Sequence, residues 1–130
     1  MLDKSKIELS IIGGIVFVLV LVSIFAVKPG ILLKKVKNTT RASHMETILS
    51  AIYGYAIDNK GFFPPCIPNF GEGATDITKC EELRPYIYKN MIPSDPDTNS
   101  KYMIEYFSGK ETRVRIFSTA KEAEGVEIIR

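Results

Sequence analysis

The hydrophobic positions of the chain change their spacing along its length, and the first region is a continuous apolar run. Residues 11–27 form a stretch of about 17 residues without a charge, and Leu9 and Ser10 extend it to about 19. A helix of that length is near the lower limit for crossing a hydrocarbon core roughly 30 Å thick. Backbone groups in hydrocarbon must be paired within the segment, so the run predicts a membrane-spanning helix despite its many β-branched residues.

A break and a second, amphipathic helical pattern follow. Pro29 removes a helical hydrogen bond and Gly30 weakens the next turn, so we expect a kink or a locally melted stretch there. Beyond it, apolar residues recur at spacings of three and four, which predicts a helix with one buried face: Met45, Ile48, Leu49, Ile52, Tyr55 and Ala56. The sequence Asp-Asn-Lys-Gly at 58–61 supplies a C-cap, so one long helix, broken or bent near Pro29, is expected to end at about residue 59.

The spacing of apolar residues changes to two at Lys101. Residues 61–100 are rich in proline and glycine and predict an irregular loop, with a short helix or turn near 80–88. Alternation then predicts strands over 101–107 and 113–118, joined by a turn at 108–110, and a third short strand over 125–130. The predicted fold is therefore α+β, with a small antiparallel sheet covered on one face by the amphipathic helix.

These patterns divide the chain into three parts: a charged segment at 1–8, a membrane-spanning segment at 9–28 and a globular head at 29–130. With 130 residues the chain has room for one small domain plus an anchor. The run is longer than the apolar region of a usual secretory signal, and no Ala-x-Ala pattern follows it, so a retained anchor is expected. A net charge of +2 is too weak to indicate nucleic-acid binding.

Cys66 and Cys80 would close a short loop if they were bonded to each other. In a chain with an export-type N-terminus a disulfide is the favoured interpretation, and two free thiols in a cytosolic loop are the alternative. A closed loop of about 15 residues contributes about 3 kcal/mol by the chain-entropy estimate.

The sequence offers little support for catalysis. His44 is the only histidine, no nucleophile lies near it, and we expect it on the helix surface, so no enzyme activity is predicted. Asp95, Asp97 and Asn99 present oxygen atoms at alternate positions of a turn, which is compatible with calcium, although an Asp-Pro-Asp turn explains them without a metal or any other cofactor. A basic group has two interpretations, a solvated helix face or a site for anionic lipid head groups: Lys34, Lys35, Lys37 and Arg41.

The order of these parts, together with three local sequences, resembles a known family. Glu8 stands at the head of the apolar helix, the second helix ends in Tyr-Ala-Ile-Asp-Asn-Lys-Gly-Phe-Phe-Pro at 55–64, and Ile-Pro-Ser-Asp-Pro-Asp at 92–97 precedes the sheet. The chain resembles the type IV pilin superfamily over nearly its whole length, and most of all the major pseudopilins of type II secretion systems.

The resemblance implies assembly. Subunits of this family are held in the inner membrane by the apolar helix, with the N-terminus cytoplasmic and the head outside, and are extruded into a helical filament. The expected partners are other copies of the chain, an inner-membrane assembly platform, related minor pilins and the lipid bilayer. Glu8 matches the family glutamate that neutralises the N-terminal amine of a neighbouring subunit, an arrangement that a low-dielectric helix bundle requires. The alternative is a single-pass, membrane-anchored extracytoplasmic binding module that does not polymerise.

The chain departs from the family in two places, and its charges raise a question of topology. Asp3 stands where the family has the glycine before its processing site, and Pro29 lies about one turn later than the usual helix-breaking proline. More basic residues follow the apolar run than precede it, which by the positive-inside rule favours a cytoplasmic head. The cysteines and the resemblance favour an exported head, which is the expectation we adopt.

Overall fold

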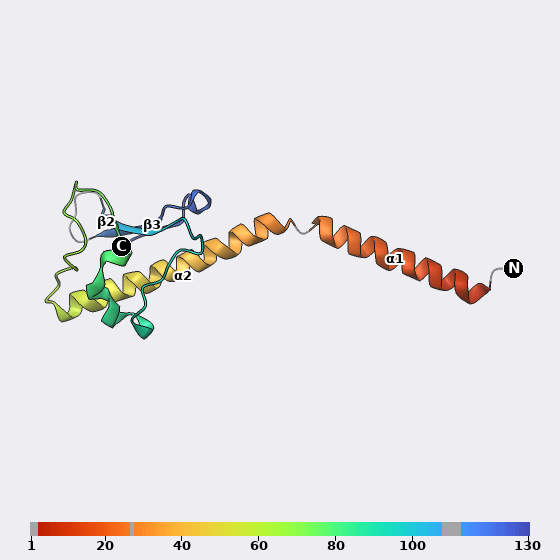
Figure 1. The fold of residues 1–130 in the computed structure, drawn as a ribbon, viewed down its shortest axis with the longest axis horizontal. Coiled ribbons are helices and arrows are strands. Elements are labelled where there is room, and N and C mark those ends of the chain that lie inside the picture. Colours follow the sequence, from red (N-terminus) through yellow and green to blue (C-terminus); the bar gives the residue numbers. More distant parts are fainter. Residues whose placement is uncertain (1–2, 27, 108–112) are drawn as a thin grey trace. The chain divides into compact units, whose positions relative to one another are not determined.

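The computed structural model of the protein describes residues 3–26, 28–107 and 113–130 (Figure 1). Two helices come first, α1 (Lys4–Ala26) and α2 (Pro29–Asp58), and short strands and 3-10 helices make up the rest. The chain divides into two compact units, Met1–Lys35 and Val36–Arg130, with α2 running through the boundary. The fold is α+β, as the sequence predicts.

Helix α1 is long and apolar enough to cross a membrane. Its 23 residues correspond to roughly 35 Å of helix. None of its residues is buried. The helix begins at Lys4, so Glu8 lies in its second turn.

The break between the helices lies just before Pro29. Helix α1 ends at Ala26 and α2 begins at Pro29, so Pro29 and Gly30 are the first two residues of a helix rather than a kink within one. The carbonyl oxygen of Lys28 accepts hydrogen bonds from Ile31 N at 3.1 Å and Leu32 N at 3.3 Å, which starts the new helix. Proline is favoured at this first position because its missing N–H has no helical acceptor there.

Helix α2 supplies one wall of the core of the second unit. Its buried positions include five of the six predicted ones, and Tyr55 is half-buried, with its ring edge-on to Tyr86 at 5.9 Å. Two buried positions of α2 were not predicted, Ala51 and Arg41. The remaining core residues come from the sheet and from the irregular segment: Ile67, Ile77, Cys80, Leu83, Ile87, Tyr102, Ile104, Val114 and Ile116.

Four antiparallel strands form one sheet in the order β1-β2-β3-β4. They are β1 (Thr75–Asp76), β2 (Tyr102–Tyr106), β3 (Val114–Ser118) and β4 (Glu127–Ile129). Ile104 pairs with Ile116, and Ile116 with Ile128, so one apolar row crosses three strands. The three predicted strands are confirmed, while β1 was not predicted because two residues show no alternation. The predicted turn at 108–110 lies outside the described residues.

The irregular segment contains three short 3-10 helices, η1 (Ile77–Lys79), η2 (Glu81–Tyr86) and η3 (Tyr88–Asn90). A fourth, η4 (Lys121–Ala123), precedes β4. The predicted short helix near 80–88 corresponds to η2 and the beginning of η3. These turns carry single apolar side chains into the core at Ile77, Leu83 and Ile87, which gives a loop of this length its anchoring points.

The C-terminal end of α2 is capped where the sequence predicts it. Gly61 N donates to Ala56 O at 2.7 Å across a residue in the left-handed region, Lys60, at φ 58°. This is the Schellman arrangement, in which glycine is the favoured left-handed residue. A lysine at that position carries strain from its Cβ atom.

Replacing Lys60 with glycine should therefore stabilise the protein. The relieved strain of about 1–2 kcal/mol is partly offset by the greater freedom of glycine in the unfolded chain, about 0.5–1 kcal/mol, so Lys60→Gly should raise the free energy of unfolding by about 0.5–1 kcal/mol. Urea denaturation of the full chain in detergent, followed by near-ultraviolet circular dichroism, measures this. The control is Lys79→Gly inside η1, which should lose stability. A loss in both variants would contradict the explanation.

Candidate functional site

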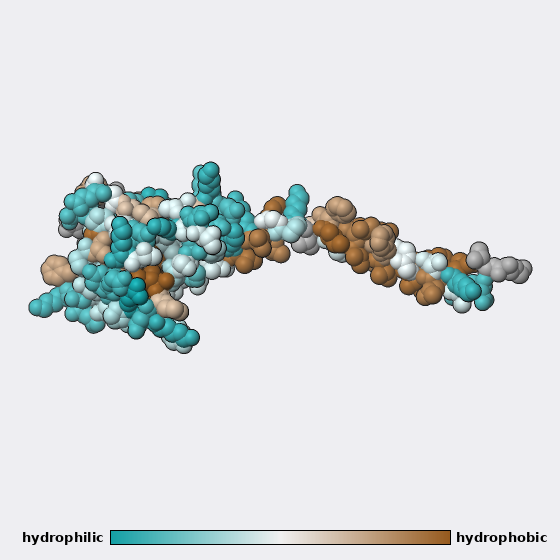
Figure 2. Space-filling model, viewed as in Figure 1, coloured by the Kyte–Doolittle hydropathy of each residue, from teal (hydrophilic) through white to brown (hydrophobic). Residues whose placement is uncertain are grey.

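Helix α1 carries the first candidate site, an apolar surface that extends around the whole helix. Its large aliphatic and aromatic side chains are exposed, among them Leu9 at 71% and Phe25 at 79% (Figure 2). Glu8 is exposed at the start of this surface. None of the ion pairs formed within the described ranges involves Glu8. A helix that is apolar on every side belongs in a membrane or inside a bundle of helices.

Cys66 and Cys80 lie at disulfide-bonding distance, with their Cα atoms 5.2 Å apart. The pair joins the segment after α2 to the start of η2, and Cys80 is fully buried in the core. The bond closes the loop that contains β1 and η1. Disulfides form and persist in oxidising compartments and are rare in the cytosol.

The second candidate site lies in the head, where Arg41 of α2 is completely buried. Its guanidinium group donates to both carboxylate oxygens of Asp95, from Nη2 to Oδ1 at 2.9 Å and from Nε to Oδ2 at 3.0 Å. Asp95 is itself 7% exposed. A planar guanidinium fork matches a carboxylate in this two-point geometry, which makes such pairs strong and strict in orientation.

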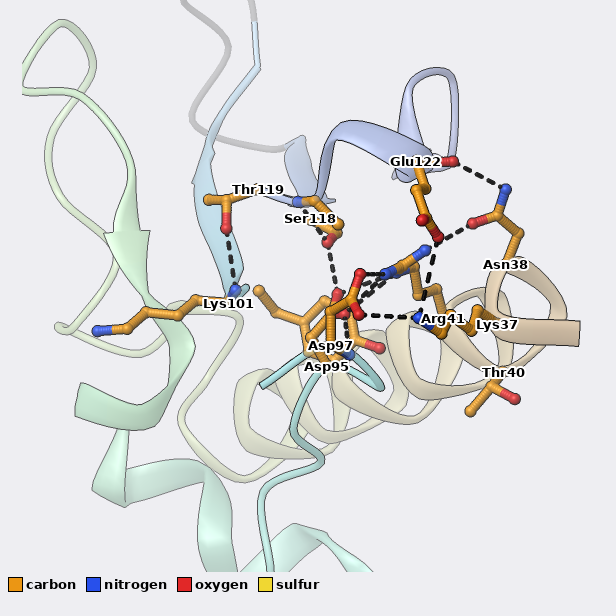
Figure 3. Close-up of polar contacts among 12 residues, drawn as sticks. Lys37, Asn38, Thr40, Arg41, Asp95, Asp97, Lys101, Ser118, Thr119 and Glu122 are labelled. Atoms are coloured by element: carbon orange, nitrogen blue, oxygen red, sulfur yellow. Dashed lines mark hydrogen bonds and ion pairs between the residues drawn. The ribbon is translucent and has the colours of Figure 1, made fainter. Parts of the chain in front are cut away.

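Four neighbouring residues complete what we call the Arg41 cluster, shown in Figure 3. Arg41 Nη1 donates to Asn38 Oδ1 at 2.8 Å, and Arg41 Nη2 also reaches Asp97 Oδ2 at 3.1 Å. Lys37 Nζ lies 2.9 Å from Asp97 Oδ1. The Ser118 hydroxyl at the end of β3 donates to Asp95 Oδ2. The cluster therefore joins α2 to the segment before the sheet and to the end of β3.

The charges of the cluster compensate one another. Burial raises the pKa of the Asp95 carboxyl, but hydrogen bonds from Arg41, Ser118 and the backbone N–H of Asp97 outweigh it and hold that pKa below its usual value. The hydrogen bond from Lys37 lowers the pKa of Asp97 in the same way. Throughout the described part of the head, no buried side-chain nitrogen or oxygen lacks a hydrogen-bond partner. The arrangement therefore holds separate segments of the head together.

The cluster corrects two interpretations of the sequence. Lys37 and Arg41 are not part of a solvated or lipid-binding face, because both point into the head and pair with aspartates. Asp95 and Asp97 do lie together, but their oxygens accept from Arg41, Lys37 and Ser118, and Asn99 is exposed. Within the described ranges no group of three His, Cys, Asp or Glu residues could hold a metal ion. The carboxylate oxygens that the calcium hypothesis requires are thus hydrogen-bonded to side chains of the protein.

The burial of Arg41 had one signal in the sequence. Arg41 lies four residues before Met45 and seven before Ile48, so it continues the buried stripe of α2. His44 was also expected at the surface, but it is half-buried, with Nδ1 3.0 Å from the hydroxyl oxygen of the buried Tyr102. Burial raises the pKa of that tyrosine.

Comparison of the chain with protein-family models, with curated proteins and with solved structures found no match.

Removing the Arg41 side chain should be strongly destabilising. Arg41→Ala leaves the buried Asp95 carboxylate without its counter-ion, and breaking a buried pair in this way costs about 3–5 kcal/mol. The matched control is Arg84→Ala, which removes an exposed arginine paired with Glu81 and should cost less than about 1 kcal/mol. Urea denaturation measures both, and equal losses would mean that Arg41 has no special role.

Acid should weaken the head through the same pair. Because the pKa of Asp95 is lower in the folded state, its contribution is fully present above the unfolded-state pKa of about 3.9 and is lost as pH falls through the folded pKa. The free energy of unfolding should therefore fall below about pH 4, and this dependence should flatten in Asp95→Asn. Urea denaturation across that range measures the effect, with the exposed Glu82→Gln as control. An unchanged acid profile in Asp95→Asn would contradict the assignment.

Proposed function

We propose that this chain is a structural subunit that is anchored in a membrane by α1 and polymerises through α1 into a filament. The filament is of the type IV pilus or type II secretion pseudopilus kind. The observation that carries the proposal is the exposed apolar surface of α1, with Glu8 at its start. The same helix suits a bilayer before assembly and a bundle of helices after it, since both surround it with apolar groups.

Glu8 supplies the proposed contact between subunits. A carboxylate at the edge of hydrocarbon is costly without a positive partner. In a bundle of parallel α1 helices, the N-terminal amine of a neighbouring copy is a cation at about the right depth to meet Glu8. This pairing would fix how far each subunit is displaced along the filament axis relative to its neighbour. Lipid around the helix would favour no particular displacement.

The head supports an extracytoplasmic role. Its disulfide pair fits an oxidising compartment, and the Arg41 cluster fixes α2 against the sheet side of the head. A helix packed against one face of a small antiparallel sheet is the pilin-like arrangement that the sequence resembles.

The second candidate is an anchored binding module that does not polymerise. Two hollows on the outer face of the sheet favour it, one of about 510 Å³ beside Phe117 and one of about 440 Å³ beside Phe70. Arg115 lines part of both hollows and forms ion pairs with Glu105 and Glu127. The two candidates differ in what they require of Glu8.

Removing the Glu8 carboxylate should abolish assembly. In cells that express the chain with its assembly system, Glu8→Ala and Glu8→Gln should eliminate the filament fraction recovered by shearing, while membrane levels of the protein stay unchanged. The control is Glu82→Ala, which removes an exposed carboxylate of the head and should leave the filament fraction intact. Filaments of normal yield from Glu8→Ala would favour the anchored module.

A further inference from the structure

The apolar surface of the protein does not stop at the end of α1. In the first turns of α2, four large aliphatic side chains are between 54% and 64% exposed: Ile31, Leu32, Leu33 and Val36. Figure 2 shows apolar surface on both sides of the break between the two helices. Removing side chains of this kind from water is favourable, so this surface is costly to leave in solution.

The length of the span places this segment outside the hydrocarbon core. The uncharged part of α1, residues 9–26, corresponds to about 27 Å of helix, which accounts for nearly all of a core of about 30 Å. The residues that follow the break therefore belong to the interfacial layer of lipid head groups. Aliphatic side chains mixed with lysines are typical of helices that bind at that layer.

The charges of the segment have one sign. No aspartate or glutamate occurs in the sequence between Glu8 and Glu46, whereas five basic residues do: Lys28, Lys34, Lys35, Lys37 and Arg41. Lys37 forms an ion pair with Asp97, and Arg41 forms one with Asp95. Lys28 and Lys34 are exposed, and neither enters an ion pair with any described residue. They are two exposed cations beside the exposed aliphatic side chains.

We propose that residues 28–36 form a lipid-binding segment that inserts its aliphatic side chains among anionic lipid head groups, with Lys28 and Lys34 on the lipid phosphates. The observations that favour lipid over a protein partner are the continuity of the segment with the membrane span and its uniformly positive charge. A second copy of the same segment would bring lysines against lysines. The inference holds for the membrane-resident chain whether or not it later forms a filament.

The test uses the full-length protein in vesicles, with a fluorescent label introduced by Leu32→Cys, since Cys66 and Cys80 are paired with each other. Phosphatidylglycerol or phosphatidylcholine carrying a spin label near the acyl carbonyl quenches the label when it lies in the interface. We expect quenching by both lipids and a preference for phosphatidylglycerol. That preference should fall about fivefold per lysine, and about 30-fold in Lys28→Gln/Lys34→Gln.

The control is Lys79→Gln/Lys121→Gln, which removes two exposed lysines of the head and should leave the lipid preference unchanged.

Three results would overturn the proposal. The first is an unchanged preference in Lys28→Gln/Lys34→Gln. The second is a label at position 32 that aqueous iodide quenches as well as one introduced by Ser50→Cys. The third is shielding that grows with the protein-to-lipid ratio, which would assign the surface to a second copy of the chain. Loss of filaments in Glu8→Ala with an intact lipid preference would leave the proposal standing.

Discussion

The uncovered surface of α1 is the constraint on which the rest of the account depends. No residue of Lys4–Ala26 is buried, although nearly all of its side chains from Leu9 onward are apolar. At about 1.5–3 kcal/mol for each large side chain removed from water, the helix needs a cover outside its own head. Lipid and the α1 helices of other copies are equally apolar covers, so exchange of one for the other has little hydrophobic cost. In the proposed filament, the polar group that distinguishes the two covers is Glu8 at the edge of this surface.

A second constraint fixes the loop before β2 and the end of β3 at one position along α2. The guanidinium group of Arg41 donates to both carboxylate oxygens of Asp95, which fixes their mutual orientation. Asp95 also accepts a hydrogen bond from the Ser118 hydroxyl, so a helix, a loop and a strand end meet at one ion pair. Buried ion pairs contribute little net stability relative to a well-packed apolar substitute, because desolvation offsets the attraction between the charges. The geometry indicates that this pair fixes the position of the sheet along α2, because a shift along the helix would leave a buried charge unpaired.

The elements with a local signal could be predicted from the sequence. The buried stripe from Met45 to Ala56 and the strands β2, β3 and β4 follow from spacings of 3.6 and 2, which do not depend on distant residues. Cys66 and Cys80 could be paired from the sequence because the chain has no other cysteine.

The burial of Arg41 could not be predicted in this way, because its charge suggested solvent and the partner that allows its burial lies 54 residues away in a proline-rich segment. The aspartates of that segment suggested a cation, and the cation they meet is a side chain of the protein. Strand β1 and the 3-10 helices have too few residues to show a period.

The measurement that tests the central claim most directly is electron cryo-microscopy of material sheared from cells that express the chain, combined with its intact mass. The account predicts filaments in which α1 helices pack together at the core, with each Glu8 carboxylate beside the N-terminal amine of a neighbouring subunit and the disulfide-linked heads outside. The intact mass would identify the residue that carries that amine. If the chain is found only as a monodisperse membrane protein, with α1 surrounded by lipid in every particle, polymerisation through α1 is contradicted and the anchored binding module takes its place.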